Sequence, residues 1–467
     1  MKQNSVYFLV GIALVSPFVA ADENRLPDIV VYLADDLSAR DLSLYGGTNI
    51  HTPAIDALAA EGMTFDRAFV ASPACAPSRA ALLTGLMPAR NGAEENHTYP
   101  HDDVQRLPGI LNELGYETAA FGKVAHNKSA KSYGFQTIDL GKDIPQVRAA
   151  VKKYLEGRSD PRPLALFVGV SNPHVPWPSE STVDPRAMTL PPRLLDTPQT
   201  RVQRSRYLQE VKDLDAYLAE LRELTRKHLA ADTLFVFSSD HGAQFPFGKW
   251  TLYDEGTRVP LIVARSGKIK AGSRSEAMVS WIDILPTLID VAGGVVPENL
   301  DGRSFASVLN DASTLHRKRI FTTHSGDRLM NVYLSRSVRT DRYKFIWNVH
   351  PEFAFTTHID LLLRETSGDY FKQWTELAKT DARAARVVAS HHGRPQYELY
   401  DLNSDPHEQR NLAGEADVAD VQRKLLEELN AWIKSQNDEL TVFHEPLMLD
   451  APDTWVPRSL PRKKKRN

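Results

Sequence analysis

Short apolar runs recur along the first two thirds of the chain and predict strands that are buried on both faces. They are rich in β-branched and aromatic residues and cover 28–34, 118–121, 164–170 and 233–239. Helical spacing of apolar residues lies between them, over 52–62, where Thr52 is the expected N-cap, and over 107–114 and 206–230. A further helix is expected over 282–292. This alternation predicts an α/β fold with a mixed, mostly parallel sheet sandwiched by helices.

The pattern of polar and apolar residues changes after about residue 326. Polar and apolar residues alternate over 335–347 across an Asp341-Arg342 turn, which predicts an antiparallel hairpin, and 397–402 has the same pattern. A helix is expected over 421–435. We therefore predict a catalytic domain over 22–325 and a smaller C-terminal α+β domain over 326–467. The basic tail 462–466 is interpreted as a solvated chain end.

The N-terminus has the features of a secretory signal peptide over 1–21. Lys2 precedes an apolar run over 6–15, and small residues follow at the expected cleavage site. The apolar run is too short to span a bilayer, so we expect a periplasmic or secreted protein without stable membrane insertion. The single cysteine excludes an internal disulfide, and the net charge of −3 gives no field that would attract nucleic acid.

Charged and imidazole side chains follow the predicted strands at the points where the strands end. These residues are Asp35 and Asp36 after the first strand, Lys123 and His126 after the second, His174 after the third, and Asp240 and His241 after the fourth. Carboxyl ends of parallel strands meet at one edge of a sheet, where ligands bind. Adjacent buried carboxylates favour a divalent cation, although a single Asp could instead cap a turn. The histidines could equally be packed loop residues.

The segment 74–85 contains the only cysteine, Cys75. Pro77 suits the first turn of a helix and Gly85 suits its end, so Cys75 is expected at the positive end of a short helix. Arg79 adds a positive charge on the same face. The alternative for a lone cysteine is a buried small hydrophobic residue.

The five residues Cys75-Ala76-Pro77-Ser78-Arg79, followed by a Leu-Thr-Gly helix end, resemble the signature of the type I sulfatases. The other motifs stand in the order of that family along nearly the whole mature chain. The resemblance implies an alkaline-phosphatase-like fold and conversion of Cys75 to formylglycine by a maturation enzyme, the hydrate being the nucleophile. It also implies a Ca²⁺ ion bound by Asp35, Asp36, Asp240, His241 and the modified Cys75.

The same resemblance implies roles for the remaining charged residues. Arg79, Lys123 and Lys249 would neutralise the sulfuryl oxygens, His174 or Lys249 would protonate the leaving oxygen, and His126 would remove the proton of the second hydroxyl. Residues 122–126 resemble iduronate 2-sulfatase, whereas the C-terminal half resembles heparan N-sulfatase. A sulfated oligo- or polysaccharide is therefore the expected substrate. Candidates for recognising the sugar are His97, His324, Arg328 and His350, each of which could equally be structural.

Two other functions use the same residues. A phosphatase or phosphonate hydrolase of the alkaline phosphatase superfamily would share the sheet and the acidic pairs, but the sequence around Cys75 argues against it. A non-catalytic glycan-binding homologue would leave Cys75 unoxidised, and the complete set of charged groups argues against that function.

Overall fold

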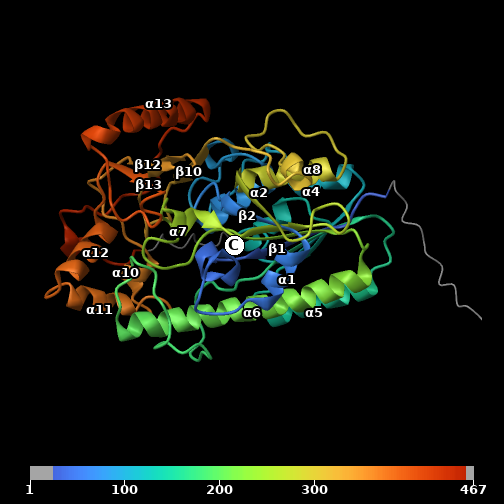
Figure 1. Cartoon of the computed structure of the whole chain (residues 1–467), viewed down its shortest axis with the longest axis horizontal. Helices are drawn as coiled ribbons and strands as arrows, with labels where there is room; N and C mark the ends of the chain where they lie inside the picture. Colours follow the sequence, from blue (N-terminus) through green and yellow to red (C-terminus); the bar gives the residue numbers. More distant parts are fainter. Residues whose placement is uncertain (1–24, 459–467) are drawn as a thin grey trace, which may run out of the picture.

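The computed structural model describes residues 25–458, which form two β-sheets with helices around them (Figure 1). Sheet A contains β1 (Ile29–Ala34), β2 (Met63–Phe69), β3 (Glu117–Gly122), β4 (Thr137–Asp139), β5 (Leu164–Gly169), β6 (Leu234–Ser239), β7 (Arg258–Val259), β8 (Leu261–Ala264) and β9 (Ser273–Ser280). Sheet B contains β10 (Ile320–His324), β11 (Ser335–Arg339), β12 (Tyr343–Asn348) and β13 (Tyr397–Asp401). The predicted signal peptide and the basic tail 462–466 lie outside the described residues.

The helices surround sheet A and one face of sheet B. They are α1 (Pro53–Glu61), α2 (Cys75–Thr84), α3 (Pro88–Asn91), α4 (Leu107–Glu113), α5 (Ile144–Gly157), α6 (Pro198–His228), α7 (Asp254–Thr257), α8 (Ile284–Val291), α9 (Ala306–Asn310), α10 (His358–Leu362), α11 (Tyr370–Leu377), α12 (Ala382–His392) and α13 (Ala419–Ser435). Helix α6 begins at Pro198, earlier than predicted, because Thr197 caps the Thr200 N–H. Helices α3, α5, α7, α9, α10, α11 and α12 were not predicted.

Sheet A is mixed but mostly parallel at its centre, as predicted. Its strand order is β4-β3-β5-β1-β6-β8-β2-β7, with β9 beside β2. The neighbours from β4 to β6 are all parallel, whereas β8 is antiparallel to both β6 and β2. The carboxyl ends of β1, β3, β5 and β6 therefore meet at one edge of the sheet.

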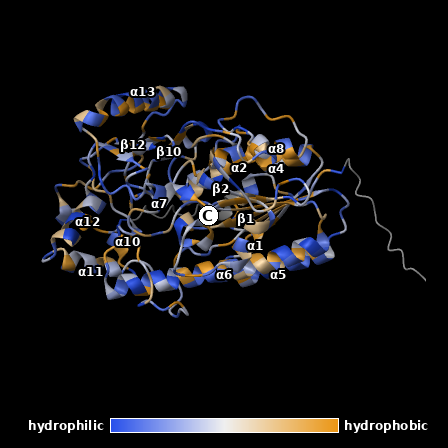
Figure 2. Ribbon diagram, in the orientation of Figure 1, coloured by the Kyte–Doolittle hydropathy of each residue, from blue (hydrophilic) through white to orange (hydrophobic). Residues whose placement is uncertain are grey.

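Alternate residues of β1 point into two separate hydrophobic cores. Val30 and Tyr32 pack on the side covered by α1, α5 and α6, and Val31 and Leu33 pack on the side covered by α2, α4 and α8. Figure 1 shows α5 and α6 below the sheet and α2, α4 and α8 above it. In Figure 2 the strands around β1 are coloured as hydrophobic, whereas α6 carries both colours. Burial on both faces explains why these strands appear as continuous apolar runs.

Helix α1 starts where the sequence predicts, but its N-terminus is capped differently. The Thr52 side chain makes no capping bond. The N–H groups of Ala54 and Ile55 instead donate to the Asp215 carboxylate of α6, at 3.2 and 2.8 Å. A carboxylate from a neighbouring helix thus satisfies these donors, which ties α1 to α6.

Sheet B is antiparallel throughout, in the order β10-β11-β12-β13. Leu425, Leu429 and Ile433 of α13 pack against Val338 and Phe345 of the sheet. Strand β10 precedes residue 326, the predicted domain boundary, and the division into two domains stays a prediction. Within the described residues, no helix combines the length and apolar character needed to cross a membrane.

Candidate active site

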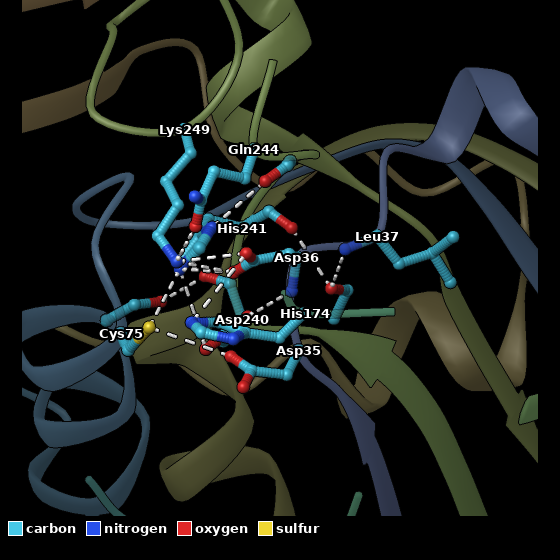
Figure 3. A network of polar contacts seen from close by, with 12 residues as sticks. Asp35, Asp36, Leu37, Cys75, His174, Asp240, His241, Gln244 and Lys249 are labelled. Carbon is cyan, nitrogen blue, oxygen red and sulfur yellow. Dashed lines mark hydrogen bonds and ion pairs between the residues drawn. The ribbon is translucent and has the colours of Figure 1, made fainter. Parts of the chain in front are cut away.

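The edge of sheet A where β1, β3 and β6 end carries a buried cluster of charged side chains (Figure 3). Asp35 and Asp36 follow β1, Lys123 follows β3, and Asp240 and His241 follow β6. Asp36 has a φ of 71°, a left-handed conformation that Asp tolerates better than most residues. Its N–H donates to Asp240 Oδ1 at 3.1 Å, which joins the ends of β1 and β6.

Cys75 is the first residue of α2 and lies within this cluster. Its Sγ is 3.3 Å from His241 Nε2 and 3.6 Å from both Asp35 Oδ1 and Lys123 Nζ. The side chain is buried, and burial raises the pKa of the thiol far above its ordinary value. Gly85 ends the helix with a φ of 67°, as its position in the sequence predicts.

Four of the cluster's side chains form a group that could bind a metal ion. The ligand atoms of Asp35, Asp36, Cys75 and His241 all lie within 4.8 Å of one another. Two carboxylates supply hard oxygen ligands, and the thiol and imidazole complete a mixed set. Asp240, which the sequence also predicted as a ligand, is not one of these four residues. Its Oδ2 accepts a 2.9 Å bond from Arg79 Nε and lies 3.6 Å from His241 Nε2.

Three cations balance the three carboxylates of this cluster. Arg79 contacts Asp35 and Asp240, and Lys123 Nζ contacts Asp35. Lys249 Nζ lies 2.8 and 2.9 Å from the two carboxylate oxygens of Asp36. Burial raises the pKa of Asp35, but Lys123, together with His174 and Arg79, outweighs burial and holds that pKa well below its usual value. The chain's own side chains therefore neutralise the cluster, and an added divalent cation would make it positive.

His174 lies on the solvent side of the cluster. Its Nε2 is 4.0 Å from Asp36 Oδ2 and its Nδ1 is 2.5 Å from the carbonyl oxygen of Val175. Burial, together with the positive charge of Lys249, lowers the pKa of His174 to about 4. At neutral pH this imidazole is uncharged in the ion-free protein.

A pocket of about 260 Å³ opens directly over Cys75. The sequence-predicted residues that line it are Cys75, His97, His126, His174 and Lys249. Three of the predicted sugar-recognition residues do not line it. His324 is buried, with Nε2 2.7 Å from Asn331 Oδ1, and His350 pairs with Glu352. Arg328 is exposed, and its backbone N–H donates to Glu95.

Several residues that complete the pocket were not predicted. They are Asn96, Val175, Pro176, Gln244, Trp250, Asp327, His358, Leu362, Arg364, Thr366 and Ser367. Many of them come from loops that follow no strand of sheet A, so the pattern of polar residues at strand ends could not find them. Trp250 and Gln244 could have been predicted, since both lie in the loop that carries Lys249.

Two family models match the chain. The model described as Sulfatase matches residues 27–295, and the one described as N-sulphoglucosamine sulphohydrolase, C-terminal, matches residues 241–360. An ulvan-active sulfatase of Formosa agariphila is 31% identical over 435 residues, which cover 89% of this chain and 81% of the relative. N-sulphoglucosamine sulphohydrolase of Homo sapiens is 29% identical over 458 residues, which cover 87% of this chain and 90% of the relative.

The fold is also found among solved structures. One structure, solved in complex with its substrate D-glucosamine-2-N,6-O-disulfate, superposes with a TM-score of 0.69 at 20% sequence identity. The match covers 90% of this chain and all of the other chain. The matched family model spans the strands that build the charged cluster and the helix that begins at Cys75. The chain therefore belongs to the sulfatase family and is a sulfuric ester hydrolase.

Proposed function

We propose that this protein removes sulfate from a sulfated carbohydrate at residue 75, after Cys75 has been converted to formylglycine. The observation that carries the proposal is the place of Cys75 Sγ, 3.6 Å from both Asp35 Oδ1 and Lys123 Nζ at the start of a helix. A buried thiol with a raised pKa is a poor nucleophile as it stands. A different reactive group is therefore needed at this position, which supports conversion of the side chain.

The donor set fits a hard divalent cation, and we propose Ca²⁺. Asp35, Asp36 and His241 would hold the ion together with residue 75, and Asp240 lies next to them. When present, the Ca²⁺ ion would supply a Lewis acid, and the hydrated formylglycine at residue 75 would supply a geminal diol as the nucleophile for sulfur. Because the chain's charges already cancel, such an ion would leave the pocket positive toward an anionic sulfate ester.

The chain's own residues would then bind the sulfuryl group and move protons. Arg79, Lys123 and Lys249 place positive charge around residue 75, where charge develops on the sulfuryl oxygens. Either His174 or Lys249, both in the pocket, would give a proton to the leaving oxygen. His126 lines the same pocket and would accept the proton that must leave residue 75.

The substrate we propose is a sulfated oligosaccharide that enters by a chain end. The similar proteins named above include sulfatases of ulvan and of N-sulphoglucosamine. The pocket volume of about 260 Å³ lies slightly below the common range for small-molecule sites, which favours one terminal sugar over a chain that passes through. Trp250, His358 and Arg364 on its wall offer aromatic and basic contacts for a sulfated ring.

The cellular location and one partner are also part of the proposal. The predicted signal peptide, residues 1–21, would export the protein to the periplasm or beyond. Conversion of Cys75 requires a maturation enzyme that recognises the segment following it, and this segment becomes α2 on folding. Conversion must precede folding, because Cys75 is 1% exposed in the folded chain.

A desulfation screen tests this function. Protein co-expressed with a maturation enzyme is incubated with ulvan, heparan, chondroitin, carrageenan and fucan oligosaccharides, and released sulfate is measured. We expect release from at least one oligosaccharide and loss of release in Cys75→Ala. Phosphate and phosphonate esters of the same alcohols form the second arm. Faster turnover of those esters than of every sulfated substrate would overturn the proposal in favour of a phosphatase or phosphonate hydrolase.

A further inference from the structure

A chain of three side chains runs from Asp327 to His126 along one wall of the pocket. His97 Nε2 lies 3.2 Å from Asp327 Oδ1, and His97 Nδ1 lies 2.6 Å from His126 Nε2. The two imidazole rings meet edge to face, with centroids 4.6 Å apart. Asp327 is buried, His97 is about a quarter exposed, and all three residues line the pocket.

The carboxylate of Asp327 is fixed in orientation. Its Oδ2 accepts bonds from Asn96 Nδ2 at 2.9 Å and from Trp250 Nε1 at 2.8 Å, which leaves Oδ1 for His97. Burial alone would raise the pKa of Asp327, but the bond from His97 and the charge of His358 hold it below its ordinary value. An ionised carboxylate only accepts hydrogen bonds.

This orientation determines which ring nitrogens carry protons. His97 must hold a proton on Nε2 to meet Asp327 Oδ1, so a neutral His97 presents the lone pair of Nδ1 to His126. His126 must then carry its proton on Nε2, which leaves its lone pair on Nδ1. A proton gained at Nδ1 of His126 would produce an imidazolium. His97 links this cation by hydrogen bonds to the carboxylate of Asp327, and a carboxylate likewise stabilises the protonated histidine of a catalytic triad.

We propose that Asp327 and His97 are positioning residues that set the tautomer of His126 and stabilise its protonated form. The proposal rests on the proposed function for the role of His126 as proton acceptor. It differs from the sequence-based hypothesis for His97, in which this side chain recognises the sugar. The two roles make different predictions: loss of a sugar contact would mainly raise KM, whereas a wrong tautomer of His126 would lower kcat.

Asp327→Asn is the sharpest test. Asn96 and Trp250 both donate to the Oδ2 position, so the amide oxygen is held on their side and the NH2 group faces His97. His97 Nε2 must then accept, its Nδ1 must donate, and His126 must lose its proton from Nε2. We expect the tautomers of both histidines to invert while the shape of the side chain at residue 327 is kept.

The first measurement is ¹⁵N NMR of the imidazoles in full-length, histidine-labelled protein with unconverted Cys75. His97→Gln and His126→Gln assign the signals. We expect Nε2–H tautomers for both rings in the wild type and Nδ1–H tautomers in Asp327→Asn. A wild-type His126 that carries its proton on Nδ1 would overturn the proposal without any variant having to fold, and whether or not the protein desulfates the carbohydrates tested.

The second measurement separates kcat from KM in converted enzyme on a substrate from the desulfation screen. We expect kcat to fall about tenfold to a hundredfold in Asp327→Asn and His97→Gln, with KM within about twofold. His316→Gln is the matched control, because His316 Nε2 also lies 3.2 Å from a buried carboxylate, that of Asp283, outside the pocket. A raised KM with unchanged kcat and tautomers would overturn the proposal in favour of sugar recognition.

Discussion

Lys249→Met separates the electrostatic balance of the cluster from its chemistry. Lys249 is 3% exposed and its Nζ lies 2.8 and 2.9 Å from the two oxygens of Asp36, with Gln244 Oε1 at 3.3 Å. Methionine keeps most of the side-chain volume and removes the charge. Asp36 would then be a buried carboxylate that has lost its nearest cation, and the cluster would hold three carboxylates against two cations.

The cost follows from these distances. Two unit charges 2.8 Å apart attract by about 6 kcal/mol at an effective dielectric constant of about 20. Burying the charged lysine also costs desolvation energy, and because the variant no longer has this cost, the net loss of stability is smaller than the attraction alone. Removing one partner of a buried pair costs about 3–5 kcal/mol, and we expect the free energy of unfolding of the ion-free variant to fall by that amount.

Lys344→Met is the matched control. Lys344 is 1% exposed and its Nζ lies 2.5 Å from Asp254 Oδ1 and 2.9 Å from Glu408 Oε1, away from the pocket. Urea denaturation should show a similar loss of stability in both variants. Only Lys249→Met should also lose kcat/KM, by about a hundredfold to a thousandfold, because Lys249 lines the pocket over Cys75 and Lys344 does not.

Calcium provides the second readout for these variants. A cation bound beside Asp36 replaces part of the missing charge. Saturating Ca²⁺ should therefore reduce the loss of stability of Lys249→Met relative to the wild type and leave the loss of Lys344→Met relative to the wild type unchanged. Full activity in Lys249→Met, or an equal loss of activity in Lys344→Met, would refute this reasoning about the cluster.

Two further predictions concern stability. Gly122→Ala should lower the free energy of unfolding by at least about 2 kcal/mol, because φ is +73° and the new Cβ would lie 2.0 Å from the carbonyl oxygen of Gly169. Gly115→Ala, with φ of +90° and no atom within 4 Å of its Cβ, should cost only about 1 kcal/mol, and equal losses in urea denaturation would contradict this explanation. Burial lowers the pKa of His324 to about 4, so the folded state favours the neutral ring and loses about 3 kcal/mol relative to the unfolded state as the pH falls from 6.5 to 4. His324→Gln should remove that part of the acid destabilisation, and identical pH dependence of unfolding in variant and wild type would show that His324 does not titrate in this way.

The central part of the fold could be predicted because sheet A is buried on both faces. The run that became β1 is fully apolar, and the acids that follow it lie at the common edge of the parallel strands, as their positions indicate. Local signals also predicted α2, since Pro77 lies in its first turn and Gly85 ends it. These inferences needed only neighbouring residues along the chain.

The parts that could not be predicted depend on contacts between distant segments. Asp215 caps α1 from a helix far along the sequence, so Thr52 alone was misleading. Asp327 reaches the pocket from a loop and His358 from the start of the short helix α10, and no local pattern distinguishes them from surface residues. His324 has the same residue type as His97, but β10 buries it beside Asn331 rather than in the pocket.

The most direct test of the central claim is peptide mass spectrometry of residue 75 combined with a desulfation assay on the same samples. Protein preparations with different degrees of conversion are compared on one sulfated oligosaccharide. We predict a loss of about 18 Da at residue 75, the mass difference between a cysteine and an aldehyde side chain, and sulfate release in proportion to the converted fraction. Equal sulfate release from protein in which Cys75 remains a thiol would contradict the account.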